Sequence, residues 1–230
     1  YVNTWAPRHG HPCQVTADEI NERLLPWLQE HATRQPWYTF VHYWDPHQPY
    51  NQPEAFRSAH TGGPAPEAID IDGEAYVPRW GWHKRLDEQS REKIDLYDGE
   101  LSYVDAAIGD VVEVLRQEGA YDETTIIVTA DHGEDLQEHN SPFEHREPYD
   151  TTVGVPLIVK PAGGVPSTPG HRVDALVGHI DLMPSILGIH EIDAPGDIDG
   201  RSWAGLLEGD GDPLHEMLFL TGSITRQQGK

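Results

Sequence analysis

A long apolar stripe with helical spacing runs through the middle of the sequence and leads almost directly into a strand pattern. Three or four residues separate its successive members, which are Ile94, Tyr97, Leu101, Val104, Ile108, Val111 and Leu115. This spacing places them on one face of an α-helix, and Gly119 suits the left-handed residue just past a helix end. The apolar run 125–129 then predicts a short buried strand. Such a succession is typical of a layered α/β fold.

The amino-terminal third contains one further helix pattern and one strand pattern. Thr16 and Glu19 have capping-box spacing, which predicts a helix start, while Pro26 predicts a kink or an early stop in that helix. Aromatic and β-branched residues at 37–44 predict a buried strand. Residues 51–83 are rich in Pro, Gly and Ala and have no period, so we expect a long surface excursion there.

The carboxyl-terminal third continues the alternation. We expect strands at 155–159 and 217–220. Between them, residues 179–187 predict a short helix that is capped by Asp181 and stopped by Gly188. Strands that alternate with helices indicate an α/β fold in which helices flank a layered sheet.

The charge balance is strongly acidic. The 230 residues include 39 acidic and 16 basic side chains, for a formal net charge of -23. Such a surface repels nucleic acids and anionic membranes, so we expect neither as a partner. Because salt screens self-repulsion, the charge favours a halophilic protein adapted to a high-salt cytoplasm, with an ordinary acidic protein as the alternative.

Cysteine usage and hydropathy bear on the compartment. Cys13 is the only cysteine, so no internal disulfide can form, which fits a reducing compartment. We therefore expect a cytoplasmic protein. No apolar run approaches the length that a bilayer-spanning helix needs, so we expect no membrane segment in this chain.

Polar clusters follow two of the predicted strands. Asp45 and His47 come after the first, and Asp131 and His132 come after the second, where Gly133 allows a sharp turn. In open α/β sheets, ligands bind beyond the carboxyl ends of strands. Asp and His are ligands for divalent cations, so adjacent Asp131 and His132 can direct two donors at one ion.

Further along the chain, His145 or Arg146 can hold an anionic substrate oxygen.

The Asp and His residues of these clusters also have simpler interpretations. Asp131 can instead cap the backbone of its own turn, and His47 can be a turn histidine between prolines. His42, within the predicted strand, is more readily explained as a hydrogen-bonded core histidine than as a ligand.

The order of these motifs resembles the sulfatase family of the alkaline phosphatase superfamily. The resemblance extends over roughly residues 16–210. The matching stretches are 39–50 (TFVHYWDPHQPY), 97–105 (YDGELSYVD), 125–134 (TIIVTADHGE), 138–139, 155–158, 178–187 (GHIDLMPSIL), 199–202 and 206–209. It implies an alkaline phosphatase-like α/β fold with a layered mixed β-sheet, incomplete at its amino-terminal side. It further implies that residues 1–210 are the carboxyl-terminal part of the sulfatase domain and that 211–230 begin a smaller subdomain.

The resemblance also implies roles for individual residues. Asp131 and His132 match the family's second pair of metal ligands, although many sulfatases have Asn in place of this His. His47 matches the histidine that contacts the sulfate or its leaving oxygen. His145 falls near the position of a substrate-binding Lys, with Arg146 as a rival. Asp105 and Asp181 match positions taken as structural.

Two family motifs have no counterpart in the sequence. One is Cys/Ser-x-Pro-x-Arg, whose first residue becomes the formylglycine nucleophile, and the other is an Asp-Asp pair of metal ligands. The surroundings of Cys13 lack the Pro and Arg. We therefore expect a fragment that lacks the nucleophile and is inactive without the missing amino-terminal half. The resemblance implies a divalent cation, Ca²⁺ for a sulfatase and Mn²⁺ or Zn²⁺ for a phosphoesterase.

The leading hypothesis is thus a sulfuric ester hydrolase that acts on a small-molecule ester. One alternative is a phosphodiester or phosphonate ester hydrolase of the same superfamily. Another is a catalytically inactive sulfatase-like remnant. A third is an independent metallohydrolase that would have to gather His42, His47, Asp131, His132 and His145 around one ion.

Overall fold

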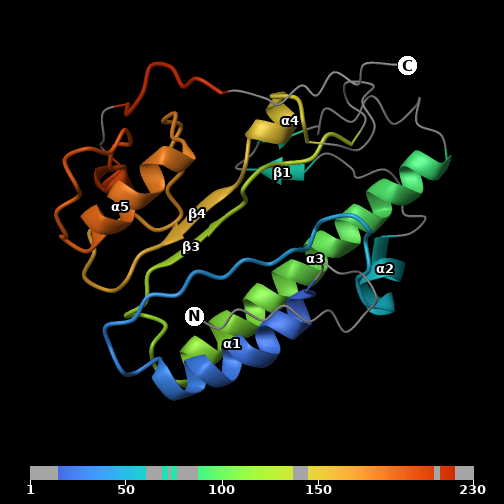
Figure 1. Cartoon of the computed structure of the whole chain (residues 1–230), viewed down its shortest axis with the longest axis horizontal. Coiled ribbons are helices and arrows are strands. Elements are labelled where there is room, and N and C mark those ends of the chain that lie inside the picture. The colour runs from blue at the N-terminus through green and yellow to red at the C-terminus, as the bar shows by residue number, and fades with distance from the viewer. Residues whose placement is uncertain are drawn as a thin grey trace. The chain divides into compact units, whose positions relative to one another are not determined.

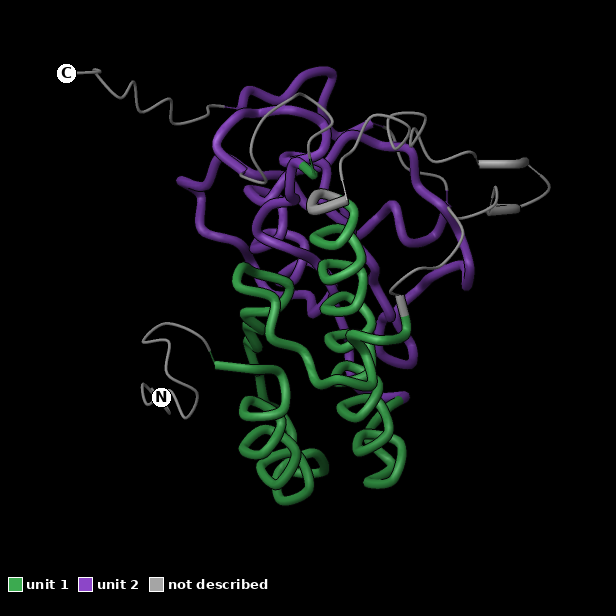
Figure 2. Tube along the Cα trace, turned by 90° about the vertical axis from the view of Figure 1, so that its right-hand side faces the viewer, with its two compact units in different colours: residues 1–121, 136–142 green, residues 122–135, 143–230 purple. Residues whose placement is uncertain are grey.

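The computed structural model describes residues 15–60, 69–71, 74–76, 88–136, 145–209 and 213–220 (Figure 1). The chain forms two compact units, which Figure 2 distinguishes by colour. Unit 1 consists of residues 1–121 and 136–142, and unit 2 of residues 122–135 and 143–230. Within the described ranges, no helix has both the length and the apolar character needed to cross a bilayer.

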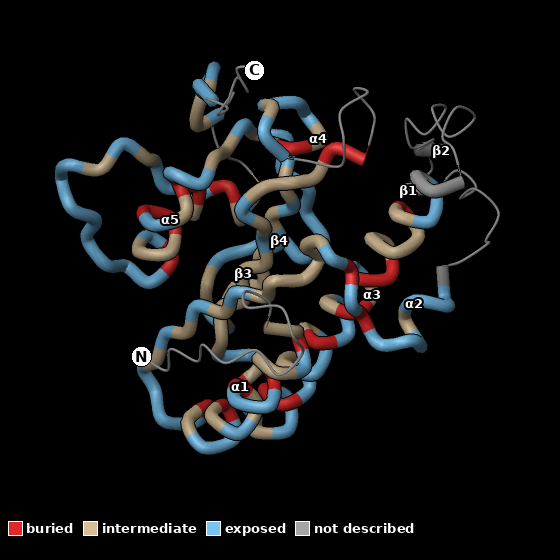
Figure 3. The backbone as a smooth tube through the Cα atoms, turned by 45° about the vertical axis from the view of Figure 1, so that its right-hand side comes forward, coloured by how far each residue is buried: buried red, intermediate tan, exposed pale blue. Residues whose placement is uncertain are grey.

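Unit 1 is built on two long helices and a short one. Helix α1 spans Ala17–His31, α3 spans Glu88–Gln117, and the short α2 spans Glu54–His60. Both α1 and α2 pack against α3. The amide of Asn21 on α1 donates to the carbonyl of Ala107 on α3 at 2.9 Å. Buried residues therefore concentrate where these helices meet (Figure 3).

The two helices predicted in unit 1 are confirmed. The Glu19 carboxylate accepts a hydrogen bond from Thr16 N–H at 3.3 Å, as the capping box requires. Pro26 does not stop the helix early, since α1 continues to His31. Gly119 follows α3 with φ of 70°, the left-handed conformation expected of a residue beyond a helix end.

The buried strand predicted at 37–44 is not present. The segment is extended but pairs with no other strand among the described residues. Its alternate side chains face solvent, with Tyr38 71% and Phe40 79% exposed. His42 lies on the same exposed side, so its interpretation as a core histidine is also wrong. The pattern correctly indicated extended backbone, but local sequence cannot supply the neighbouring strand that buries it.

The excursion predicted at 51–83 contains regular structure. Besides α2, strand β1 (Ile69–Ile71) pairs antiparallel with β2 (Glu74–Tyr76). These elements are too short for periodicity to reveal them. The other residues between 61 and 87 lie outside the described part, as does the predicted domain boundary at 210.

Unit 2 contains a two-stranded antiparallel sheet. Strand β3 (Ile126–Thr129) pairs with β4 (Leu157–Lys160), with Ile126 opposite Lys160 and Thr129 opposite Leu157. Both strands were predicted, each with slightly different bounds, but β3 is half-buried and not buried as expected, with Thr129 exposed. The short helix α4 (Asp150–Val153) precedes β4.

Short helices follow the sheet and build the core of unit 2. They are the 3-10 turn η2 (His179–Asp181), α5 (Leu182–Ile189) and the 3-10 turn η3 (Ala204–Glu208). Trp203 and Leu206 form the buried centre of the cluster with Ile189 of α5, and side chains of β3 and β4 pack against it. This core fixes the sheet and therefore the turn that leaves β3.

Three details of unit 2 differ from the prediction. Gly188 lies within α5 and does not end it. Asp181 occupies the N-cap position of α5 as predicted, but its side chain makes no capping hydrogen bond and accepts Gly178 and Arg201 N–H instead. Residues 217–220 form no strand, and Phe219 is 89% exposed.

Candidate functional site

The turn that leaves β3 carries the predicted metal ligands Asp131 and His132. The backbone N–H of His132 donates to Asp131 Oδ1 at 3.0 Å, and Gly133 N–H donates to Thr152 O at 2.8 Å. A Cβ at Gly133 would overlap the carbonyl oxygen of Thr151. The close approach of these two segments therefore requires glycine at 133 and directs the turn.

His145 lies against this turn. Its ring stacks on that of His132, with centroids 4.0 Å apart and an interplanar angle of 23°. His145 Nδ1 lies 3.5 Å from Oε1 of Glu134, whose side chain is nearly buried. Three of the four predicted site residues, Asp131, His132 and His145, are thus neighbours within unit 2. His145 and its rival Arg146 are both exposed.

The chemistry of Asp131 and His132 suits a divalent cation. His132 Nδ1 lies 2.9 Å from Gly133 O, so this nitrogen carries the proton and Nε2 keeps the lone pair that binds a metal. That Nε2 is 3.6 Å from Asp131 Oδ2. Within the described ranges, no group of three or more His, Cys, Asp or Glu residues can enclose an ion. The pair can supply two ligands, but the described residues contain no complete donor set around it.

His179 supports the same turn and was not singled out by the sequence. Its Nε2 donates to the carbonyl of Ala130 at 2.8 Å, immediately before Asp131. This hydrogen bond ties the start of η2 to the end of β3. No sequence motif predicted this hydrogen bond, because His179 and Ala130 are 49 positions apart.

His47 lies in unit 1, on the turn that follows the extended segment. Its Nδ1 donates to Gln48 O at 2.7 Å, and its ring centroid lies 4.8 Å from that of Trp44. The protonated nitrogen of His47 is thereby fixed. Because His47 and the Asp131 turn belong to different units, their convergence on one substrate stays a prediction.

Beside the His47 turn, the half-buried Asp45 is accompanied by a buried carboxyl group, Glu100, that the sequence did not indicate. Glu100 of α3 is fully buried and accepts the N–H groups of Asn51 at 2.6 Å and of the next residue at 3.0 Å. Asp45 accepts the N–H of Ala17, the first residue of α1, at 2.8 Å. Burial, followed by the negative charge of Asp45, raises the pKa of Glu100 to about 8. Burial also raises the pKa of Asp45.

A second fully buried carboxyl group, Asp181, lies in unit 2. Its oxygens accept Gly178 N–H and Arg201 N–H, each at 2.8 Å, and His215 Nε2 at 2.9 Å. Burial alone would raise the pKa of Asp181, but these hydrogen bonds and the charge of His215 outweigh it and lower the pKa.

Comparison with known proteins decides the family. The family model described as Sulfatase matches residues 2–192.

The chain belongs to the sulfatase family.

Curated relatives match over different lengths of this sulfatase chain. The ulvan-active sulfatase of Formosa agariphila is 27% identical over 125 residues, which cover 54% of this chain and 24% of the relative. The arylsulfatase of Clostridium perfringens is 22% identical over 231 residues, which cover 90% of this chain and 45% of the relative. The chain therefore spans less than half the length of these sulfatases.

Solved structures confirm the fold class. The phosphonate monoester hydrolase SpPMH from Silicibacter pomeroyi is 28% identical with a TM-score of 0.68, covering 86% of this chain and 43% of that one. The sulfatase chain thus has the alkaline phosphatase-like α/β fold predicted for it, and its two units represent part of that fold.

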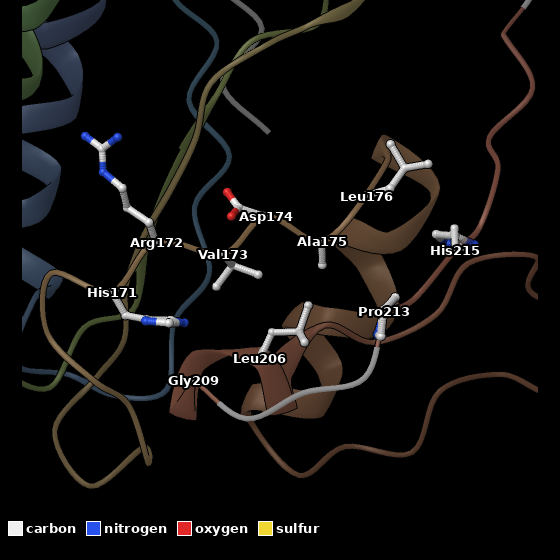
Figure 4. A pocket seen from close by; sticks show the side chains of 10 residues that line it. All are labelled: His171, Arg172, Val173, Asp174, Ala175, Leu176, Leu206, Gly209, Pro213 and His215. Atoms are coloured by element: carbon white, nitrogen blue, oxygen red, sulfur yellow. The ribbon is translucent and has the colours of Figure 1, made fainter. Parts of the chain in front are cut away.

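A surface cavity of about 420 Å³ lies apart from the predicted site residues of the sulfatase. It opens between residues 171–176, η3 and residues 213–215 of unit 2 (Figure 4). None of Asp131, His132 and His145 lines it. The side chain of Arg172 extends away from Val173 and Leu206, so its guanidinium group does not point into the cavity (Figure 4). The turn after β3 is therefore the stronger candidate site.

Proposed function

We propose that this chain supplies part of the active site of a metal-dependent sulfuric ester hydrolase. The observation that carries the proposal is the cluster of Asp131, His132 and His145 on the turn after β3, in a chain of the sulfatase family. A carboxylate and an imidazole with its metal-binding nitrogen fixed are suitable ligands for a divalent cation.

Each residue has a chemical role in this proposal. Asp131 and His132 Nε2 hold a divalent cation, Ca²⁺ for a sulfate ester, which when bound neutralises charge on the transferring group. His145, stacked on His132 and adjacent to Glu134, binds an oxygen of the ester anion. His47 donates a proton from Nε2 to the leaving alkoxide, which requires the doubly protonated imidazole because Nδ1–H is held by Gln48 O.

The nucleophile, in this proposal, comes from sequence other than these 230 residues, which contain no Cys/Ser-x-Pro-x-Arg motif. The extended segment 37–44 supports the same idea. Its exposed Tyr38 and Phe40 alternate with half-buried residues, as in a strand that has a neighbour on the sheet. We expect the chain alone to bind metal weakly and to show no turnover.

A phosphonate or phosphodiester ester hydrolase is the second candidate. Its support is the 28% identity to SpPMH. His132 is compatible with both candidates, because the resemblance implies His at this ligand position in phosphonate and phosphodiester hydrolases as well as in many bacterial sulfatases. Substrate preference and the preferred ion, Mn²⁺ or Zn²⁺ against Ca²⁺, separate the two.

The test uses the complete reading frame that contains this chain. The product is stripped with a chelator and reloaded with Ca²⁺, Mn²⁺ or Zn²⁺, and hydrolysis of 4-nitrophenyl sulfate and 4-nitrophenyl phenylphosphonate is compared. We expect sulfate hydrolysis with Ca²⁺, and a loss of about 100-fold or more in Asp131→Asn and His132→Ala. Asp193→Asn, an exposed carboxylate in unit 2, is the matched control.

Three outcomes decide between the proposals. A preference for the phosphonate ester with Mn²⁺ or Zn²⁺ would establish the second candidate. Full sulfatase activity in Asp131→Asn would contradict the metal site. Absence of hydrolysis with every ion and both esters would leave a catalytically inactive sulfatase-like protein as the conclusion.

A further inference from the structure

The turn that carries His47 is closed at its base by contacts to two helices. At its beginning, Asp45 Oδ2 accepts the N–H of Ala17, where α1 begins. At its end, Glu100 Oε1 on α3 accepts the N–H groups of residues 51 and 52. Both ends of the turn are therefore held by carboxyl groups, one from the turn itself and one from α3.

Residues just beyond the turn are packed tightly onto α3. The buried side chain of Gln52 donates from Nε2 to Leu96 O at 2.8 Å. A Cβ at Gly99 would approach Gln52 Nε2 to 2.6 Å and Phe56 O to 2.9 Å, so this position accepts only glycine without displacement. The end of the turn consequently has little freedom to move away from Glu100.

The two carboxyl groups also meet each other. The two side chains interact, since the charge of Asp45 is, after burial, the largest cause that raises the pKa of Glu100. A hydrogen bond between the two groups requires a proton on one of them. With both groups ionised, Glu100 Oε2 is buried and has no hydrogen-bond partner among the described residues. Two carboxylates that interact also repel each other, and the fully buried Glu100 lacks the water that would stabilise its charge. A proton retained on one of the two carboxyl groups provides Glu100 Oε2 with a hydrogen-bond partner and removes the repulsion.

We propose that Asp45 and Glu100 hold one proton between them and that their hydrogen bond positions His47 by closing the base of its turn. We call this pair the carboxyl clamp. Glu100 is a positioning residue, since it acts on the reaction through His47. The catalytic role of His47 rests on the proposed function, whereas the clamp itself does not.

The surroundings of the clamp keep its proton at neutral pH. Burial and the Asp45 charge raise the pKa of Glu100 to about 8, and burial, with a smaller contribution from the charge of Asp18, raises that of Asp45. Tyr103 stays neutral, because burial raises its pKa to about 12. Among the other titratable groups on the packed elements, Glu19, Lys93, Asp95 and Asp98 are half-buried, whereas the exposed ones include Glu22, Arg23, Glu54, Arg57, Arg91 and Glu92. The clamp should therefore open as the pH rises above about 8.

The experiment measures the clamp directly in the full 230-residue chain. Carboxyl carbons of Asp and Glu are labelled and titrated by NMR, and hydrogen exchange is followed at the amides of residues 51 and 52. Wild type is compared with Glu100→Gln, Asp45→Asn and Glu100→Ala. Either amide can donate to the remaining carboxylate and so mimics the shared proton. Glu92, exposed on the same helix, provides Glu92→Gln and Glu92→Ala as matched controls.

The clamp predicts that Glu100 titrates near pH 8 in the wild type. Glu100→Gln and Asp45→Asn should retain amide protection and the His47 imidazole resonances. Glu100→Ala should lose about 10- to 100-fold of the protection at residues 51 and 52, because their buried N–H groups lose their acceptor. Titration of Glu100 at its ordinary value, or equal losses in Glu100→Gln and Glu100→Ala, would overturn the proposal. If Glu100→Ala does not fold, the wild-type titration and the two amide variants still decide.

Activity of the complete enzyme tests the link to His47 separately. Glu100→Gln should keep kcat within about threefold of wild type and remove the fall in kcat above pH 8, while Glu100→Ala lowers kcat more than it raises KM. An unchanged pH profile in Glu100→Gln would show that the clamp does not position a catalytic group. If the enzyme proves inactive, the NMR results still establish or refute the clamp.

Discussion

Glu100 in unit 1 and Asp181 in unit 2 are both fully buried carboxyl groups that accept two backbone N–H groups, yet their pKa values move in opposite directions. The N–H donors are similar in number and distance. The third partner differs, being the acid Asp45 for Glu100 and the base His215 for Asp181. Burial is the largest single cause acting on both groups, so the opposite outcomes reflect the partners: the charge of Asp45 adds to burial at Glu100, whereas the hydrogen bonds and the charge of His215 together outweigh it at Asp181.

Glu100 and Asp181 also differ in role, because one positions a turn and the other stabilises a unit. Asp181 stays ionised and holds together Gly178, Arg201 and His215, which lie on three separate stretches of unit 2. Glu100 keeps a proton near neutral pH and can release it under mildly basic conditions. Unit 2 is therefore held by a permanent charge, and the His47 turn of unit 1 by a titratable one.

The largest expected effect comes from removing the permanent charge. Asp181→Ala should lower the free energy of unfolding of unit 2 by about 3–5 kcal/mol, because His215 and two N–H groups lose a buried partner. Urea denaturation at pH 7 measures this, with the exposed Asp193→Ala as control. A loss below about 1 kcal/mol would mean that Asp181 is no more important than an exposed carboxylate.

The pH dependence of stability should differ in sign between the two groups. The raised pKa of Glu100 gives stability that is complete below its ordinary value of 4.5 and is lost as the pH rises toward 8. Relative to Glu100→Gln, wild type should lose on the order of a few kcal/mol over that range. The lowered pKa of Asp181 gives stability that is present above its ordinary value of 3.8 and is lost as the pH falls further. Parallel curves for wild type and Glu100→Gln in urea denaturation would contradict the assignment.

Changing the third partner tests the comparison directly. His215→Gln keeps a hydrogen-bond donor to Asp181 but removes the positive charge. The pKa of Asp181 should rise, and the free energy of unfolding should fall by about 1–2 kcal/mol, the difference between a charge-assisted and a neutral hydrogen bond. NMR titration and urea denaturation provide the two measurements, with the exposed His190→Gln as control. An unchanged pKa would show that the N–H donors alone lower it.

The smallest effect is expected at an exposed ion pair. Arg34 lies 3.3 Å from Glu30 on the surface beyond α1, with both side chains more than half exposed. Arg34→Ala should change the free energy of unfolding by less than about 0.5 kcal/mol, since water screens the interaction. Thermal unfolding at low and high salt measures it. A change comparable with that of His215→Gln would show that burial is not what separates these pairs.

Local sequence predicted the helices well, because their signals lie within a few residues. The stripe from Ile94 to Leu115 and the Thr16–Glu19 capping box identified α3 and the start of α1. The β-branched run before Asp131 identified β3. The segment 37–44 was misjudged, because a strand becomes buried only through a partner that its own sequence does not specify.

The candidate site was predictable where motif and turn coincide. Adjacent Asp131 and His132 followed from sequence, and the family from the order of the motifs. Two contacts of the site could not be predicted from the sequence: the stacking of His145 on His132 and the hydrogen bond from His179 to Ala130. Each of them joins residues from separate elements.

The sequence by itself determined the long helices, the strand before Asp131 and membership of the sulfatase family. Only the tertiary structure decided which carboxyl groups are buried and what lies beside them. Asn51 and Glu100 are 49 residues apart, and Asp181 and His215 are 34 apart. Periodicity and capping signals act over a single turn of chain, whereas desolvation and the charge of a distant neighbour arise only when the chain has packed.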